Sequence, residues 1–209
     1  GVSFAIHAGE TLGLVGESGC GKTTLGRLTL GLLAADGGKV IFDGQLLSDW
    51  LKGDPAGLRR RMQVIFQDPL DSLDPRFTVE RSIAEPLRAC RADTDEAIRR
   101  QVKDALTEVQ LPHEVMSAYP HELSGGQRQR VGIARAIAVR PRLIVCDEPV
   151  SSLDLSIQAQ VLRLLDRLQK KYEIAYLFIS HDLSVVEALS QQVAVMSQGR
   201  VVEMGPTWQ

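Results

Sequence analysis

The sequence predicts an α/β protein built on a largely parallel sheet. Short apolar runs of strand length alternate along the chain with amphipathic helical patterns, which is typical of parallel strands joined by helices. Two of these runs, Leu143–Cys146 and Ala175–Ile179, are almost continuously apolar, as in strands that are covered on both faces. The composition agrees, because 209 residues with 44% hydrophobic and 24% charged residues are enough for one domain with its own core.

Strands are expected wherever an apolar run has strand length and is bounded by turn residues. The expected strands are Val2–Ile6, Thr11–Val15, Lys39–Phe42, Met62–Phe66, Leu143–Cys146, Ile174–Ile179, Val193–Met196 and Arg200–Glu203. The first, third and last of them are shorter and more mixed in character. We therefore place those three in a peripheral antiparallel piece of an otherwise mainly parallel, mixed sheet.

Helices are expected where apolar residues recur with helical spacing. One such face is formed by Ile157, Val161, Leu164, Leu165 and Leu168, and another by Ile98, Val102, Ala105, Leu106 and Val109. Residues 71–140 carry this pattern without a convincing strand, and they separate two strand-rich segments. We expect a single domain over residues 1–209, a fragment of a longer chain, with an α/β core from residues 1–70 and 141–209 and an inserted helical lobe from residues 71–140. Residues 68–76, which include Pro69 and Pro75, are expected to form a loop.

Charge and composition exclude several classes of protein. The formal net charge is −2, so no basic field favours nucleic acid or an anionic membrane. No window approaches the roughly 18 consecutive apolar residues of a membrane-spanning helix. Cys20, Cys90 and Cys146 have no metal-ligand spacing and cannot all pair, which fits a reducing compartment. No secretion signal precedes the first strand, and both ends look cut rather than natural.

The segment Gly16–Thr23 (GESGCGKT) matches the phosphate-binding pattern G-x-x-x-x-G-K-[ST], between an apolar strand and a helix-forming run. Its glycines let backbone N–H groups point at phosphate oxygens, and the helix that follows adds its positive end. Lys22 is expected to reach the β- and γ-phosphates, and the Thr23 hydroxyl to bind Mg²⁺. The residues expected to bind the nucleotide here are Gly16, Glu17, Ser18, Gly19, Cys20, Gly21, Lys22, Thr23 and Thr24.

A second site is expected where the strand Leu143–Cys146 ends in two acids, Asp147 and Glu148. A buried parallel strand delivers such carboxylates to the edge of the sheet where ligands bind. Asp147 would hold Mg²⁺ directly or through water, and Glu148 would orient or deprotonate an attacking water. A solvated acidic turn is the alternative for this segment alone.

The octapeptide Leu123–Arg130 (LSGGQRQR) lies between these two motifs, and with all three in this order the chain resembles the nucleotide-binding domain of ABC (ATP-binding cassette) proteins. The resemblance covers essentially all 209 residues. It implies a P-loop ATPase with ATP and Mg²⁺ as ligands. Ser124 and the two glycines after it open a helix whose N–H groups form a second anion site. The resemblance implies that Ser124, Gly125, Gly126 and Gln127 close on the ATP of a second cassette, identical or a sibling, in a head-to-tail dimer.

Three further positions match the family. Gln67, after the strand that ends at Phe66, resembles the glutamine that meets Mg²⁺ and reports to the membrane partner. Asp154 lies in a segment that resembles the loop across the dimer interface, and His181 resembles the histidine that touches the γ-phosphate. The catalytic residues implied are thus Glu148, His181, Lys22 and Gln67, and the metal ligands are Thr23, Gln67 and Asp147.

Three segments before Leu123–Arg130, which we call the signature, narrow the resemblance to oligopeptide, dipeptide and nickel importers. They are Phe66–Pro69, Ser72–Arg76 and Tyr119–Glu122. The resemblance implies an ATPase on the cytoplasmic face of the bacterial inner membrane that powers solute uptake through separate permease subunits. A solute-binding protein would take part indirectly, and no nucleic acid is expected.

Three alternatives stay open: a soluble ABC ATPase of DNA repair or translation, a phosphonate-degradation component, and a scaffold that binds nucleotide without hydrolysing it. Two departures from the family are also visible. The aromatic that stacks on adenine would lie upstream of Gly1, so Val2 and Phe4 are not assigned that role. The C-terminal extension of the peptide branch would lie beyond Gln209.

Overall fold

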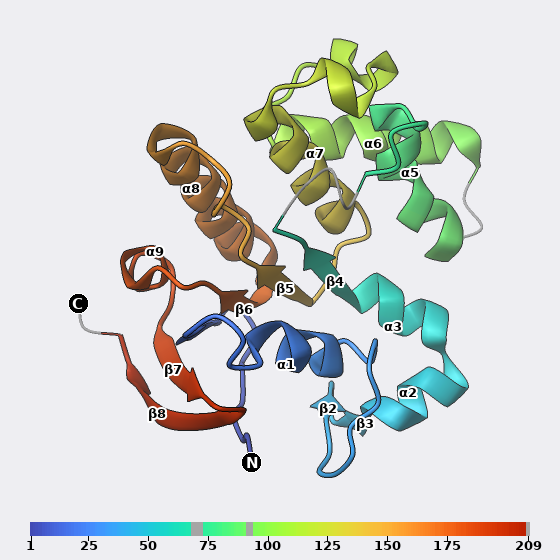
Figure 1. Ribbon diagram of the computed structural model, residues 1–209. Coiled ribbons are helices and arrows are strands. Elements are labelled where there is room, and N and C mark those ends of the chain that lie inside the picture. The colour runs from blue at the N-terminus through green and yellow to red at the C-terminus, as the bar shows by residue number, and fades with distance from the viewer. Residues whose placement is uncertain (68–72, 91–93, 208–209) are drawn as a thin grey trace.

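The structure is a computed structural model that describes residues 1–67, 73–90 and 94–207. Its main sheet has the strand order β4-β5-β6-β1-β7-β8 (Figure 1). The strands are β1 (Thr11–Gly16), β4 (Met62–Ile65), β5 (Leu143–Asp147), β6 (Ala175–Ile179), β7 (Gln192–Ser197) and β8 (Arg200–Pro206). All neighbours pair in parallel except β7 and β8, which are antiparallel. The strands expected at β1, β4, β5, β6 and β7 are therefore confirmed, apart from their end residues.

The two faces of the sheet are covered by different helices, because successive side chains of a strand point to opposite faces. In β5, Ile144 and Cys146 belong to one apolar cluster, and Val145 belongs to the other. The first cluster includes residues of α5 (Val79–Cys90), α6 (Asp95–Glu108), α7 (Gly125–Ala138), α8 (Leu155–Tyr172) and α9 (Leu183–Glu187). The second includes residues beside or within α1 (Lys22–Thr29), α2 (Leu47–Gly53) and α3 (Pro55–Arg61). Figure 1 shows α1 and α7 on opposite sides of the sheet.

Local sequence explains where several helices begin. Thr94 caps α6 by accepting a hydrogen bond from the Ala97 amide at 3.3 Å, and two acids follow in the first turn. Asp54 caps α3 by accepting from the Gly57 amide at 2.8 Å, with Pro55 at the first helical position. The helices expected around residues 98–109 and 157–168 are confirmed as α6 and α8.

Three strand predictions need correction. Val2–Ile6 forms no strand: alternate side chains pack on the second cluster, but no described segment pairs with its backbone. Lys39–Phe42 shortens to β2 (Ile41–Phe42), which forms a separate hairpin with β3 (Gln45–Leu46). Arg200–Glu203 does not join that peripheral piece, because β8 extends the main sheet beside β7.

The short helices α2, α3 and α9 were not predicted. Among the described residues of the segment 71–140 no strand occurs, and besides α5, α6 and α7 there are two 3₁₀ turns, η1 (His113–Ser117) and η2 (Pro120–Glu122). The division into core and lobe stays a prediction. The loop expected at residues 68–76 lies partly outside the described residues. Asp68, Pro69 and Ser72 lie wholly outside them. Within the described segments, none of the helices combines the length and apolar character needed to cross a bilayer.

Candidate functional site

The phosphate-binding segment leaves the C-terminal end of β1 and enters α1 through backbone that requires glycine. Gly16 has φ +152°, and a Cβ there would lie 2.1 Å from the Met196 carbonyl oxygen in β7. Gly21 has φ +107° and precedes the first residue of α1. The turn between β7 and β8 supports the loop from outside, since the Gly199 amide donates to the Cys20 carbonyl at 2.9 Å. The loop therefore has a defined shape set by two neighbouring strands.

The Lys22 ammonium lies inside this loop. It is 6% exposed and donates to the carbonyl oxygens of Gly16 at 2.7 Å and Glu17 at 3.0 Å. Within the described residues it forms no ion pair. A buried cation whose described partners are carbonyl oxygens and the Cys20 sulfur, at 3.9 Å, has no ion-paired carboxylate to balance its charge, and a phosphate group supplies a negative charge.

The N-terminus of α1 is open in the same place. Its first turn contains no acid, and no side chain of the described residues caps its backbone N–H groups. Unpaired N–H groups at a helix start attract anions. Together with Lys22, this makes the loop a fit for the phosphates of a nucleotide.

Asp147 at the end of β5 faces Thr23 at the start of α1. The Thr23 hydroxyl donates to Oδ1 of Asp147 at 3.1 Å. Burial raises the pKa of the Asp147 carboxyl, the Thr23 hydrogen bond opposes this shift, and the neighbouring Glu148 adds to it. A half-buried carboxylate and a hydroxyl in contact are oxygen ligands of the kind Mg²⁺ prefers, so these residues fit that ion.

Gln67 follows β4, the strand next to β5, so its backbone lies at the same edge of the sheet as Asp147. The Ser152 hydroxyl donates to the Gln67 carbonyl at 3.5 Å, and the Gln67 side chain is exposed. No described contact joins the Gln67 amide to Thr23 or Asp147. Its role as a metal ligand stays a prediction.

Glu148 and His181 lie at this edge as well. The Glu148 amide donates to the carbonyl of Ile179, the last residue of β6, at 2.9 Å, and His181 follows β6 by two residues. His181 Nδ1 lies 3.1 Å from Oε2 of Glu148. Glu148 has φ +50°, a left-handed conformation that is uncommon for a residue with a Cβ. Such strain is typical of functional positions.

The signature segment opens α7 with a reciprocal cap. The Gln127 amide donates to the Ser124 hydroxyl at 3.3 Å, and the Ser124 amide donates to the Gln127 side-chain carbonyl at 2.9 Å. A Cβ at Gly126 would lie 2.9 Å from Cγ2 of Ile157, so only glycine lets α7 approach α8 this closely. No described hydrogen bond joins Ser124 to residues 16–23.

Asp154 precedes α8 and does not cap it through its side chain. The next residue, Leu155, is 82% exposed, and Leu183, close to His181, is 57% exposed. Two apolar side chains thus lie in water, one beside Asp154, which is expected at a dimer interface, and one near His181, which is expected to touch the γ-phosphate.

The structure gathers Lys22, Thr23, Asp147, Glu148 and His181 at one edge of the sheet, and it leaves the Ser124–Gln127 turn at the head of α7 outside that group. One residue was overlooked in the sequence. Arg27 lines the same small depression as Thr23 and Asp147, and its charge partly opposes the rise that burial causes in the pKa of the Asp147 carboxyl. Its position four residues after Thr23, one helical turn away, is the signal that identifies it.

A glycine-rich loop between the parallel strand β1 and a helix, with an acid at the end of β5, which is separated from β1 by β6 alone, defines the chain as a P-loop NTPase. A family model described as ABC transporter matches residues 1–151. The chain belongs to the ABC transporter family.

Similar proteins agree with this assignment. The chain is 51% identical over 205 residues to the glutathione import ATP-binding protein GsiA of Pectobacterium atrosepticum, covering 98% of this chain and 33% of that protein. It is 49% identical to the probable peptide ABC transporter ATP-binding protein y4tS of Sinorhizobium fredii, covering 98% and 58%. The chain thus spans between a third and three fifths of these relatives.

A solved structure shares the fold at a lower sequence identity. It is the dimeric, post-hydrolysis state of the ATP-binding cassette MJ0796 bound to ADP and phosphate, with a TM-score of 0.86 and 27% identity. The match covers 100% of this chain and 90% of that one.

Proposed function

We propose that this chain is the ATP-binding and ATP-hydrolysing part of an importer for peptides or a related small solute such as glutathione. The observation that carries the proposal is the meeting of Lys22, Thr23, Asp147, Glu148 and His181 at one edge of the sheet. The proposed nucleotide-binding residues are Gly16–Thr24 of one cassette with Ser124–Gln127 and Asp154 of the other, and the proposed ligands of Mg²⁺ are Thr23, Gln67 and Asp147.

The residues of the site have separate tasks in hydrolysis. Lys22 binds the β- and γ-phosphates and offsets the charge that develops on them. Glu148 accepts a proton from the attacking water, and His181 holds the Glu148 carboxylate through its 3.1 Å contact. Mg²⁺, when bound by Thr23 and Asp147, supplies further positive charge next to the phosphates.

The functional unit is proposed to be a head-to-tail dimer of two such cassettes, identical or siblings. Ser124 and Gly126 begin a helix on the opposite side of the sheet from α1 and have no described hydrogen bond to their own phosphate loop. The exposed Leu155 and Leu183, next to Asp154 and His181, would be covered in the dimer. The dimeric cassette of similar fold supports this arrangement.

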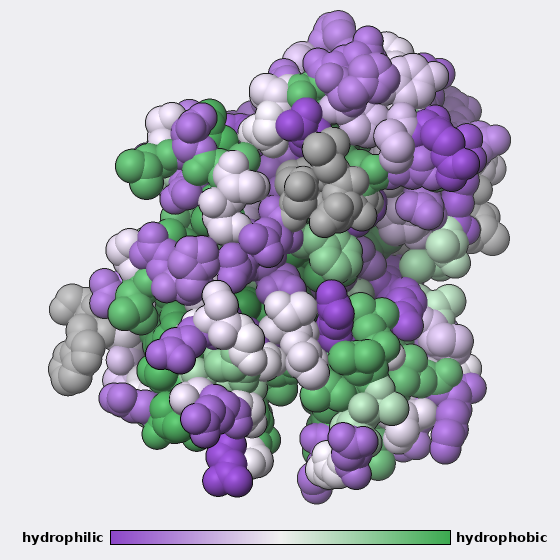
Figure 2. Space-filling model, viewed as in Figure 1, coloured by the Kyte–Doolittle hydropathy of each residue, from purple (hydrophilic) through white to green (hydrophobic). Residues whose placement is uncertain are grey.

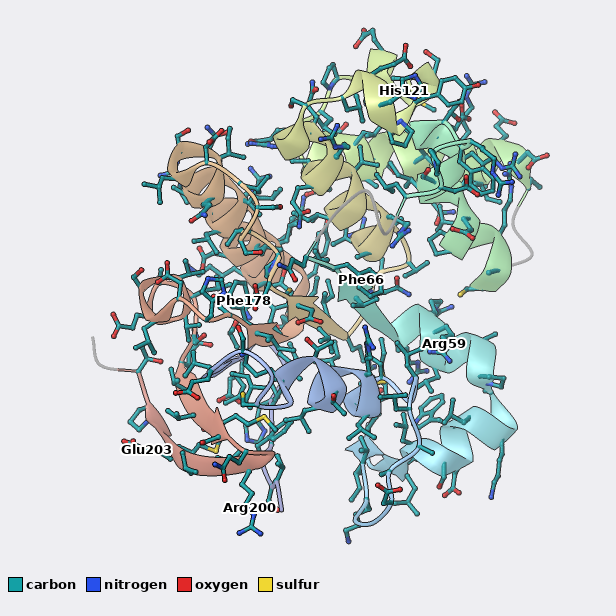
Figure 3. All side chains as sticks on the ribbon, viewed as in Figure 1. Arg59, Phe66, His121, Phe178, Arg200 and Glu203 are labelled. Atoms are coloured by element: carbon teal, nitrogen blue, oxygen red, sulfur yellow. The ribbon has the colours of Figure 1, made fainter. Side chains whose placement is uncertain are left out.

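The membrane partners are proposed to be permease subunits on the cytoplasmic face of the inner membrane, with a solute-binding protein acting indirectly. The names of the two relatives support import of glutathione or peptides. Figure 2 shows an apolar area beside α1 and the β2–β3 hairpin, where Leu32, Leu33 and Ile41 are exposed. Phe66, labelled at the end of β4 in Figure 3, lines the same depression as Leu32. We expect a permease helix to dock on the exposed Leu32, Leu33 and Ile41, beside the depression that Thr23 and Asp147 also line.

The test is reconstitution of the full-length protein with its permease in liposomes. Uptake of a labelled dipeptide or glutathione should require ATP. Both this uptake and ATP hydrolysis should be lost in Lys22→Ala. ATP hydrolysis without uptake of any peptide would leave the ATPase assignment intact and contradict the assignment as a peptide importer. No hydrolysis in any reconstituted state would contradict both.

A further inference from the structure

Arg128, in the first half of α7, contacts the chain that leads into the signature. One of its guanidinium nitrogens, Nη1, donates to the Leu123 carbonyl at 2.7 Å and lies 3.5 Å from the Pro120 carbonyl. Leu123 directly precedes Ser124, and its side chain is 6% exposed. A cation in contact with two carbonyls draws the turn before the helix back against the helix itself.

This contact completes a series of caps around Ser124. Upstream, the Tyr119 amide donates to the Glu122 carboxylate at 2.6 Å and the Glu122 amide donates to the Tyr119 carbonyl at 2.9 Å, so η2 is capped as well. Downstream lies the reciprocal cap between Ser124 and Gln127. Arg128 joins the two caps, because it alone among the described residues bonds the carbonyl between them. Figure 3 shows His121, in η2, at the far end of this part of the molecule from the sheet.

The cap also determines what the Ser124 hydroxyl can do. Its oxygen accepts from the Gln127 amide, and no described hydrogen bond uses its proton, which is therefore available to a second molecule. That geometry depends on the backbone of Leu123 and Ser124 staying in place, since the Ser124 side chain is otherwise exposed.

We infer that Arg128 is a positioning residue for the signature: by binding the carbonyl of Leu123 it orients Ser124 toward the ATP of the opposing cassette. Charge-assisted hydrogen bonds of this kind are stronger than neutral ones. They also cost little conformational entropy when the donor is a rigid guanidinium. The inference rests on the proposed function, since it requires a second cassette. Arg128 itself touches no nucleotide in this scheme.

The experiment uses the full-length protein with its permease in lipid nanodiscs. Arg128→Gln removes the charge, and kcat for ATP hydrolysis should fall at least about tenfold. Binding of a fluorescent ATP analogue to the open state should stay within about twofold, since the phosphate loop is on the other side of the sheet. Trapping of nucleotide by vanadate should fall in parallel with kcat. Arg128→Lys keeps one donor and should recover at least half of the lost activity.

The matched control is Arg130→Gln, on the same helix. Arg130 also donates to a backbone carbonyl, that of Val109 at 2.9 Å, but this carbonyl lies at the end of α6. Its loss should lower the melting temperature without changing kcat by more than about threefold. An equal loss of kcat in both variants would overturn the inference, because the effect would then be one of general stability.

A double-mutant cycle with Ser124→Ala separates positioning from other effects. If Arg128 acts through Ser124, Arg128→Gln should lower kcat much less in a Ser124→Ala protein than in the wild type. Fully additive losses, or wild-type kcat in Arg128→Gln, would overturn the inference alone. A wild-type protein that does not hydrolyse ATP would instead overturn the proposed function. If Arg128→Gln does not fold, Arg128→Lys carries the same cycle with a smaller effect.

Discussion

His181 and Glu148 are joined at the edge of the sheet, with Nδ1 of the histidine 3.1 Å from Oε2 of the carboxylate. The contact uses one carboxylate oxygen only. Within the described residues, Oε1 has no hydrogen-bond partner and is available to a water molecule. The Glu148 side chain is 19% exposed, so solvent can reach part of it.

Glu148→Gln tests the role of this carboxylate. The amide keeps the shape of the side chain but cannot accept a proton, so hydrolysis should slow by about 100-fold or more. ATP binding should persist, and the protein should accumulate as a dimer in size-exclusion chromatography with ATP. Glu203→Gln, on β8, is a control that should leave hydrolysis unchanged. A Glu148→Gln protein that is monomeric with ATP and still active would contradict the assigned role.

Alkylation of Cys20 should block ATP binding. Its thiol is 8% exposed, and its Sγ lies 3.9 Å from Nζ of Lys22, so an added group takes the place of phosphate. Cys146 should not react under the same conditions, because burial and the neighbouring Asp147 raise the pKa of its thiol. The measurement is ATP affinity after treatment with N-ethylmaleimide, with each cysteine followed by mass spectrometry.

Treatment with N-ethylmaleimide should lower ATP affinity equally in Cys90→Ser protein. That result would rule out modification of Cys90 as the cause. Unchanged ATP affinity at complete modification of Cys20 would refute the prediction.

Gly126→Ala should destabilise the domain, whereas Gly125→Ala should not. A Cβ at position 126 would lie 2.9 Å from Cγ2 of Ile157, whose branched side chain turns with difficulty. At position 125 the nearest atom is 3.8 Å away, an ordinary contact. We expect Gly126→Ala to lower the free energy of unfolding by about 1–2 kcal/mol. Gly125→Ala should stay within about 0.5 kcal/mol of wild type or stabilise slightly.

Denaturant unfolding measures both values. Adding Ile157→Ala should remove most of the penalty of Gly126→Ala, since Cγ2 is then absent. A penalty that survives this second substitution would show that contact with α8 is not its cause.

Asp74 should titrate well below other aspartates. Hydrogen bonds from the Arg76 side chain and backbone lower the pKa of its carboxyl from 3.8 to about 2. Because the folded-state pKa lies below the unfolded value, the ion pair stabilises the fold above about pH 4, and this contribution is lost as the pH falls toward 2. Carbon-13 NMR titration of the side chain measures the pKa.

Arg76→Gln should return this pKa most of the way toward 3.8. Arg88→Gln removes a different ion pair, with Asp95, and should leave Asp74 unaffected. A normal pKa for Asp74 in the wild type would show that the Arg76 contact does not persist in solution.

Much of the sheet and its ligand edge could be predicted because the signals are local. A continuous apolar run followed by two acids defines β5 and Asp147, and the glycine-rich pattern defines the loop before Lys22. One local signal was overlooked. Asp43–Gly44 is a two-residue hairpin turn with φ values of +50° and +76°, and this dipeptide identifies β3 beside β2.

The remaining features depend on partners far away in the chain. Val2–Ile6 alternates like a strand, but pairing decides whether it becomes one, and alternation says nothing about the neighbour. β8 has the same local character, yet it joins the main sheet because β7 lies next to it. The contact of Gly126 with Ile157 joins two helices separated by a strand, so spacing within either helix could not indicate it.

The 18 residues of α8 connect two distant parts of the molecule. The helix is ~27 Å long and starts after Asp154, on the surface proposed to meet a second cassette. Near its far end, Lys171 binds the Glu108 carboxylate at 2.6 Å and Arg167 donates to the Glu108 carbonyl, so it is fastened to the end of α6. A helix bends little over this length, so α8 is expected to move as a rigid unit. We expect a displacement of Asp154 to be transmitted along α8 to Glu108, which would couple the helices of the segment 79–138 to movement at the proposed dimer surface.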